Sequence, residues 1–367
     1  MLVSVIFLLL IVQQLALCEH TDHCRAKHEK VKAIDMVRSI NKTPKISWKA
    51  STYKLKEIDM NLIAKTKLGV RMEDMRMMTS AKVQKLEKES KKPTANATNI
   101  PENFTWANAN HAKCPLGTIR DQSNCGGCWA LAPASVLSDK FCLKSNGTIT
   151  TPLSHQKLLS CVENNYGCSG GYMRYVFDFL KQYGTITGGE FDSDKGCQMY
   201  EIRPCGAFSS KMPCAFPEAF TPKCRGDRCN NEWYKYKTEK NHYKMLEYKW
   251  VPAFFSDDQA RQEIYENGPI LATFWVYPDF VLYKKGIYVH KMGWWPLGGH
   301  AVKVVGWGVE NDVKFWHVAN SWGEDWGENG YFRIRRGTNE CNFDWNLTAL
   351  VPDYNNNNKT KSVSGTQ

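Results

Sequence analysis

Apolar residues recur at helix-face spacing in the middle of the chain, whereas short apolar runs separated by turn residues dominate its last third. Helical spacing is clearest after Cys128, where apolar side chains from Trp129 to Phe141 share one face, so a helix is predicted to begin at Cys128. Three further helices are predicted from start and stop signals, namely after the N-cap candidate Ser154, from Met173 to a stop at Gly184, and from a capping box at 256–259 to a stop at Gly268.

The later apolar runs have the length and the flanking turn residues of β-strands. Strands are predicted at 270–276, 286–290, 300–305, 314–320 and 331–335. Helices that precede strands along the chain indicate two lobes, one mainly α and one mainly β. The predicted fold class is therefore α+β.

The first 99 residues do not share this pattern. The apolar run from Leu2 to Val12, followed by Ala16 and Cys18, predicts a signal peptide over residues 1–18. It is too short for a transmembrane span, and no later stretch is long enough. Residues 19–99 are polar and charged and contain no core of their own, which favours a pro-segment with an exposed linker at 91–98. The alternative is a permanently attached flexible arm.

The 367-residue chain has a formal net charge of +11, which raises the question of a nucleic-acid partner. Residues 1–100 hold 19 Lys and Arg against 10 Asp and Glu, giving +9, and the remainder holds 29 against 27, giving +2. The body is thus nearly neutral, and neither a nucleic-acid partner nor a membrane partner is expected. The polar, asparagine-rich tail at 353–367 is expected to be disordered.

The fourteen cysteines of a secretory chain indicate disulfides. Loss of Cys18 with the signal peptide leaves an odd number, so at least one thiol is free or pairs with another molecule. Six glycosylation sequons agree with the secretory route; they begin at Asn41, Asn96, Asn103, Asn146, Asn346 and Asn358.

Two cysteines lie three residues apart at the predicted helix start, Cys125 and Cys128. A helix N-terminus presents unpaired N–H groups and the positive end of the helix dipole, which favour the thiolate form of Cys128 and make it a candidate nucleophile. From the residues alone, a redox or metal-binding Cys-x-x-Cys motif and a further disulfide remain open alternatives.

A nucleophilic cysteine needs a base, a group that orients the base, and donors for the oxyanion. His300 follows two glycines at the start of a predicted strand, and Asn320 ends another strand beside Trp322. Gln122 lies six residues before Cys128 and has a side-chain N–H to donate. These residues together form a candidate catalytic set.

With these motifs the chain resembles the papain-like cysteine proteases, and within them the cathepsin B group. The resemblance is carried by the sequence motifs at 122–129, 168–172, 298–301 and 318–323, and by 47–50, which is similar to part of a cathepsin B pro-peptide. It implies a two-lobe peptidase domain over 100–352, with a mainly helical lobe at about 112–230, a β-barrel-like lobe at about 231–352, and the active-site cleft between them.

The resemblance also implies roles for individual residues. Cys128 and His300 would form a thiolate–imidazolium pair, in which Cys128 attacks the peptide carbonyl and His300 protonates the leaving amine. Asn320 would orient the imidazole ring. Gln122 and the Cys128 backbone N–H would bind the oxyanion. The implied substrate-binding residues are Gly170 and Gly171, which would pair with substrate backbone, Trp322, which would shield the His300–Asn320 bond, and Asn346; no cofactor and no metal are implied.

By the same resemblance, five disulfides are implied: Cys114 with Cys142, Cys125 with Cys168, Cys161 with Cys224, Cys197 with Cys229, and Cys205 with Cys214. This pairing would leave Cys128 and Cys341 free, and Cys24 unpaired in the pro-segment.

The sequence departs from the family pattern at four places. The loop at 205–214 lacks the two adjacent histidines that hold a substrate's terminal carboxylate in cathepsin B, which argues against dipeptide release, although Lys211 is a candidate replacement cation. Asn346 replaces an acidic residue at the base of the S2 pocket, which favours apolar P2 groups, and its sequon is expected to be unoccupied. Gly127 replaces a serine, and Pro133 falls inside the predicted helix, where it either kinks the helix or is tolerated near its first turns.

These observations predict a cysteine endopeptidase that is made as a zymogen in the secretory pathway and is lysosomal or secreted. Its expected partners are peptide or protein substrates, its own pro-segment as inhibitor, and cystatin-like inhibitors, and a monomer is expected. The alternative is a catalytically impaired homologue that binds peptides or a protein partner.

Overall fold

The computed structural model describes residues 31–53, 57–71, 73, 100–107, 113–206, 208, 214–254 and 256–354. The predictions about the signal peptide, Cys18, Cys24, Lys211, the linker at 91–98 and the tail from 355, and the sequons at Asn96 and Asn358, lie outside these residues. No helix within the described ranges is long and apolar enough to cross a membrane.

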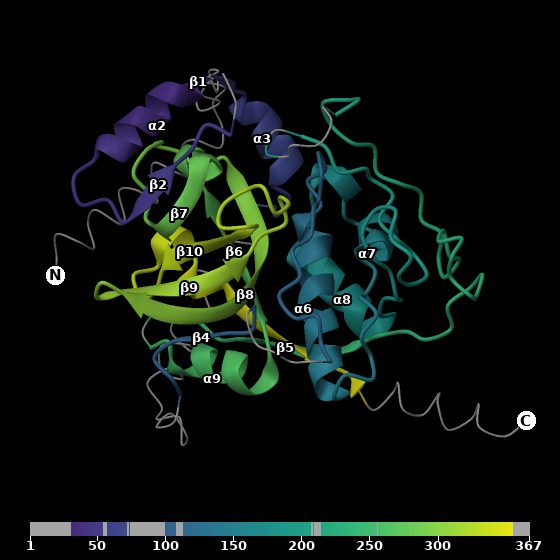
Figure 1. Cartoon of the computed structure of the whole chain (residues 1–367). Helices are drawn as coiled ribbons and strands as arrows, with labels where there is room; N and C mark the ends of the chain where they lie inside the picture. The colour runs from purple at the N-terminus through teal and green to yellow at the C-terminus, as the bar shows by residue number, and fades with distance from the viewer. Residues whose placement is uncertain are drawn as a thin grey trace, which may run out of the picture.

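The helical lobe contains α6 (Cys128–Lys144), α7 (His155–Cys161) and α8 (Met173–Gln182), which lie side by side in Figure 1. All three begin where the sequence predicts, and the Ser154 hydroxyl caps α7 by accepting a hydrogen bond from the Lys157 amide at 3.0 Å. The apolar face of α6 is fully buried at Val136, Leu137 and Phe141. This packing holds the start of α6 in place.

Pro133 lies within α6, and the helix continues through it to Lys144. Proline has no N–H to donate to the Trp129 carbonyl, so one hydrogen bond of the second turn is missing. Trp129 is fully buried and its indole donates to the Gly167 carbonyl at 3.0 Å. Pro133 therefore does not end the helix, whose last residue is Lys144.

The second lobe is built on a nine-stranded mixed sheet of order β2-β7-β10-β9-β8-β6-β11-β5, with β4 (Phe104–Thr105) paired to β8. Among the described strands β2 and β5 lie at the two ends of this order, so the sheet is open and the expected barrel is not closed. The bounds are β2 (Trp48–Ala50), β5 (Met245–Trp250), β6 (Ile270–Val276), β7 (Tyr283–Tyr288), β8 (Gly298–Glu310), β9 (Val313–Ala319), β10 (Tyr331–Arg335) and β11 (Leu347–Pro352).

Helix α9 (Asp258–Asn267) packs on the sheet and corrects one prediction. The capping box placed Ser256 at the N-cap, but the N-cap residue is Asp257, and its side chain makes no cap hydrogen bond. The carboxylate of Asp257 instead pairs with Arg261 at 2.8 Å. A charged partner one turn along the helix thus competes with the cap for this side chain.

Five disulfides cross-link the helical lobe and the irregular stretch that follows α8. They join Cys114 to Cys142, Cys125 to Cys168, Cys161 to Cys224, Cys197 to Cys229, and Cys205 to Cys214, the same pairs that the family resemblance implied. Covalent links supply order in a stretch that has little periodic packing.

The N-terminal segment, defined here as residues 31–53 and 57–71, packs across both lobes. It contains β1 (Val31–Lys32), α2 (Ala33–Lys42), β2, β3 (Glu57–Ile58) and α3 (Met60–Lys67). Figure 1 shows α2 over the sheet and α3 above the junction of the two lobes. The apolar face of α2 is buried in the core of the β lobe, and β2 pairs with β7, so this segment uses the core of the body in place of one of its own.

Trp48 in β2 is the main anchor of this segment. Its ring is 1% exposed and lies 5.1 Å from the ring of Tyr288, and its indole donates to the Val289 carbonyl at 2.9 Å. Trp48→Phe keeps an aromatic ring but leaves that carbonyl unpaired, at a cost of about 1.4 kcal/mol. Amides of α2 and β2 in the full chain are expected to exchange hydrogen about tenfold faster, whereas Lys49→Ala, at an exposed position of the same strand, should leave the rates unchanged.

Candidate functional site

The candidate catalytic residues meet where the helical lobe packs on the sheet. Cys128 begins α6, His300 lies in β8, and Asn320 directly follows β9. His300 Nε2 lies 2.8 Å from Asn320 Oδ1, and the rings of His300 and Trp322 are 5.1 Å apart. All four side chains are buried. His300 Nδ1 has no hydrogen-bond partner among the described residues, which leaves one ring nitrogen free to take up a proton.

Cys128 is one of two cysteines without a disulfide in the described part of the chain; the other is Cys341. Cys125 is bonded to Cys168, so the Cys-x-x-Cys pair is not a dithiol and cannot act as a redox or two-thiolate metal motif. The described residues also contain no group of three or more His, Cys, Asp or Glu residues placed to hold a metal ion. Of the alternatives left open by the sequence, the free thiol remains.

Gln122 is held in a fixed orientation beside Cys128. The Ser321 hydroxyl donates to its Oε1 at 2.7 Å, which directs Nε2 toward the cleft, where it lies 2.7 Å from the Cys125 carbonyl and 3.2 Å from the Lys67 carbonyl. Ser321 was not predicted as a site residue. Its place between Asn320 and Trp322 in the 318–323 motif was the available signal, but only the three-dimensional structure shows that it contacts Gln122.

The N-terminal segment runs through this cleft as an extended strand. Gly69 accepts a hydrogen bond from the Gly171 amide at 2.7 Å, and the Arg71 amide donates to the Gly171 carbonyl at 3.1 Å. On the other wall, the amides of Gly69 and Val70 donate to the Gly299 carbonyl at 3.2 and 3.1 Å. Gly171 therefore pairs with extended backbone, the contact that the resemblance implied for a substrate, but here the occupant belongs to the same chain.

The segment passes directly over the thiol because Gly69 has no side chain. A Cβ at Gly69 would collide with the Gly126 carbonyl oxygen and lie 3.2 Å from Cys128 Sγ. The neighbouring Leu68 and Val70 are buried in the walls of the cleft. In this arrangement the N-terminal segment occupies the space that a peptide substrate would need.

Burial under the segment opposes ionisation of the cysteine. Desolvation raises the pKa of the Cys128 thiol to about 11, although hydrogen bonds from backbone amides, including those of Ala301 and Gly69, oppose the rise. Desolvation lowers the pKa of His300 to about 4, opposed by the Asn320 hydrogen bond and assisted by the charge of Lys67. Burial under the segment thus opposes the charged forms of both groups, and the thiolate stays a prediction for the uncovered site.

Asn346 lies in a buried turn, Asp344–Asn346, and is 1% exposed. Its Nδ2 donates to the Asn342 carbonyl at 2.8 Å, while its Oδ1 has no hydrogen-bond partner among the described residues. The sequon threonine, Thr348, is equally buried, so a glycan at Asn346 would require this turn to leave the core.

The loop between Cys205 and Cys214 is represented in the described residues by Gly206 and Phe208. Phe208 is 5% exposed, and its ring stacks on that of Trp322 at 5.5 Å between centroids. An aromatic ring from this loop, one that the sequence did not single out, therefore lies against the tryptophan that covers the His300–Asn320 pair.

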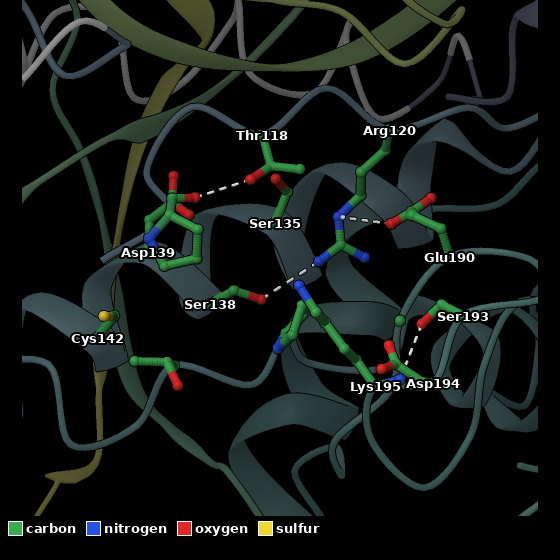
Figure 2. Close-up of a pocket in the computed structure, with 14 residues that line it drawn as sticks. Thr118, Arg120, Ser135, Ser138, Asp139, Cys142, Glu190, Ser193, Asp194 and Lys195 are labelled. Atoms are coloured by element: carbon green, nitrogen blue, oxygen red, sulfur yellow. Dashed lines mark hydrogen bonds and ion pairs between the residues drawn. The ribbon is translucent and has the colours of Figure 1, made fainter. Parts of the chain in front are cut away.

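A separate cavity of about 220 Å³ lies along the later turns of α6 (Figure 2). Its buried cation, Arg120, donates to the Ser138 hydroxyl at 3.3 Å and lies 3.6 Å from the Glu190 carboxylate. Lys303 and Asp139, on its other side, pair at 2.7 Å. Its only cysteine, Cys142, is in a disulfide, so the residues that line this cavity include no free thiol.

Comparison with known proteins agrees with the geometry of the cleft. Residues 100–351 match the family model described as "Papain family cysteine protease". The chain is 42% identical over 266 residues to cathepsin B-like cysteine proteinase 4 of Caenorhabditis elegans, covering 70% of this chain and 77% of that protein, and 42% identical over 273 residues to cathepsin B-like cysteine proteinase 5, covering 71% and 76%.

Among solved structures, procathepsin B S9 from Trypanosoma congolense superposes with a TM-score of 0.68 at 30% identity, covering 88% of this chain and all of that one. The proform of the ragweed pollen allergen Amb a 11, a cysteine protease, superposes with a TM-score of 0.62 at 20% identity, covering 87% of this chain and 84% of that one. The second likeness concerns the fold alone. Both structures are proforms, as their names state.

Proposed function

Because the chain belongs to the papain family of cysteine proteases and is a cathepsin B-like cysteine peptidase, we propose that it is an endopeptidase kept inactive by its own N-terminal segment. The observation that carries this proposal is the path of residues 67–71, which places the Lys67 carbonyl on Gln122 Nε2 and Gly69 over the Cys128 thiol. The domain limits are proposed as 1–18 signal peptide, 19–99 pro-segment, 100–352 peptidase and 353–367 tail.

In the proposed reaction, the Cys128 sulfur attacks the carbonyl carbon of the scissile peptide bond after its proton has passed to His300. The C=O electron pair moves onto oxygen, and Gln122 Nε2 donates to that oxyanion together with the Cys128 backbone N–H. Collapse breaks the C–N bond while His300 returns its proton to the leaving amine. Water, deprotonated by His300, then hydrolyses the thioester and releases the acid product and the free thiol.

Asn320 and Trp322 act on this reaction through His300. The 2.8 Å bond to Asn320 Oδ1 fixes the ring and leaves Nδ1 as the nitrogen that exchanges protons. Trp322 covers the pair and keeps water from competing for the bond. The two residues are positioning residues in this proposal, and Ser321 has the same relation to Gln122.

The proposed specificity follows from two neutral positions. Asn346 has no charge to offer a basic P2 side chain, so apolar P2 groups are preferred. The loop at 205–214 has no histidine pair to hold a terminal carboxylate, and Phe208 presents a hydrocarbon ring at the corresponding end of the cleft. Cleavage within a chain is therefore expected to exceed release of C-terminal dipeptides. Transit through the secretory pathway, with a lysosomal or extracellular destination, is part of the same proposal.

The test compares the full chain with the form from which the pro-segment has been removed. The processed form is expected to hydrolyse an internally quenched peptide with an apolar P2 residue at least tenfold faster than a substrate cleaved only by dipeptide release, and an epoxide thiol inhibitor should label it stoichiometrically. The full chain should be labelled only slowly. Absence of turnover after removal of the pro-segment would favour the peptide-binding alternative.

A further inference from the structure

The side chain of Lys67, the last residue of α3, is buried in the cleft of the peptidase body. It is 4% exposed, and its Nζ donates to the Ser123 carbonyl at 2.6 Å. The ring of Phe208 lies 5.7 Å from Nζ, within the range of a cation–π contact. Burial lowers the pKa of Lys67, and the charge of Asp121 opposes this shift. Burying an ammonium group is costly unless its surroundings compensate, so these three groups form a subsite for a cation.

The place of this subsite along the cleft follows from the path of the segment. Val70 pairs with Gly171 on one side of the thiol, Gly69 crosses the thiol, and Lys67 lies beyond it. The Lys67 carbonyl accepts from Gln122 Nε2 at 3.2 Å and from the Trp322 indole at 3.4 Å. The subsite is therefore on the side of Cys128 opposite to Gly171, where a substrate's leaving-group residues would bind.

The walls of the subsite belong to the body and are fixed by contacts that do not involve Lys67. Ser123 has a φ of 58°, a left-handed conformation that is uncommon for a residue with a side chain. Its amide donates to Asp121 Oδ1 at 2.8 Å and its hydroxyl to the Arg203 carbonyl at 2.7 Å, and these bonds hold the peptide so that its carbonyl meets Nζ. Phe208 stacks on Trp322 of the body, and its ring also meets that of Tyr53 in the N-terminal segment at 5.5 Å.

We propose that this subsite, formed by the Ser123 carbonyl, Asp121 and the ring of Phe208, gives the enzyme a preference for lysine or arginine on the leaving-group side of the scissile bond. The inference rests on the proposed peptidase function and adds a substrate class to it. Lys67 is the model for the bound side chain: its ammonium group lies over the Phe208 ring and donates to the Ser123 carbonyl. Asn346, the neutral residue at the bottom of the S2 pocket, would then favour apolar side chains on one side of the scissile bond. The cation-binding subsite would favour lysine or arginine on the other side.

The test uses the processed enzyme and internally quenched peptides that differ only at the first residue after the scissile bond. Lysine at that position is expected to give a kcat/KM about tenfold above norleucine, which has the same stem without the charge, and glutamate should be slower than norleucine. Phe208→Leu and Asp121→Asn should each reduce the ratio of kcat/KM for lysine over norleucine from about tenfold to about threefold. Equal rates for lysine and norleucine overturn the inference, whereas no turnover of any peptide counts against the proposed function.

A second measurement uses the full chain and does not depend on catalysis. Lys67→Met removes the charge and keeps the stem, so the segment should open more readily and Cys128 should react with a small disulfide reagent about tenfold faster. Lys65→Met is the matched control, because Lys65 lies two residues earlier on α3, is exposed, and pairs with Glu218 only at the surface. Labelling rates that are equal in the two variants would show that the subsite does not recognise the cation.

Discussion

Cys128→Ala in the processed enzyme is expected to lower kcat/KM by about 10⁴-fold or more. Alanine offers no atom that can attack the carbonyl, so the thioester cannot form and His300 has no proton to receive. What remains is the positioning of the peptide against Gly171 and the donor of Gln122, which alone contribute little without a nucleophile. Hydrolysis of a fluorogenic peptide, followed to complete conversion, measures the residual rate.

Two comparisons make this result specific to the thiol. Cys341→Ala removes the other free cysteine of the described chain and should leave turnover within about twofold, because Cys341 lies among Tyr288 and Glu340, away from the cleft. Cys128→Ala removes only a sulfur at a buried helix start, so the thermal midpoint should stay within a few degrees of the parent. If Cys128→Ala retained turnover and thiol-inhibitor labelling, the nucleophile would have to be sought elsewhere.

The elements that bear the catalytic motifs could be predicted because their signals are local. The apolar face after Cys128 fixes where α6 starts, and the runs at β6 and β10 have the observed limits, Ile270–Val276 and Tyr331–Arg335. Strands β5 and β11 were not predicted: in β5 the charged residues Glu247 and Lys249 interrupt the apolar run, and β11 directly follows the turn at Asp344–Asn346. The family resemblance, and not periodicity, supplied the pairing of Cys125 with Cys168.

The contacts that decide the state of the site lie between segments far apart in the chain, and no local pattern encodes them. Ser321 reaches Gln122 across 199 residues, and Lys67 reaches Ser123 across 56. The thiolate form of Cys128 was predicted from its helix terminus and from the family resemblance, and neither takes account of the covering segment, which removes water from the thiol. The sequence of the N-terminal segment indicates no core of its own. In the structure its apolar side chains are buried in the core of the body.

Acid is expected to release the pro-segment, through His300. The pKa of His300 is about 4 while the segment covers it, against an ordinary value of 6.5, and burial is the main cause. Docking therefore opposes protonation of this ring. The resulting stabilisation of the docked state is fully present above pH 6.5, and it declines by up to tenfold per pH unit as the pH falls toward 4. The whole shift would correspond to a rise of about 300-fold in the dissociation constant of the segment over that interval, and the expected rise is smaller because Phe274 and Trp322 of the body also bury the ring.

The measurement uses the full chain after cleavage in the linker at 91–98, with the segment still bound. The fraction of segment that remains bound, determined by sedimentation at several pH values between 6.5 and 4, gives the dissociation constant. His300→Asn has no ring to protonate and should lose most of the pH dependence while the segment still binds at pH 6.5. A slope that persists in His300→Asn would assign the acid response to groups other than His300.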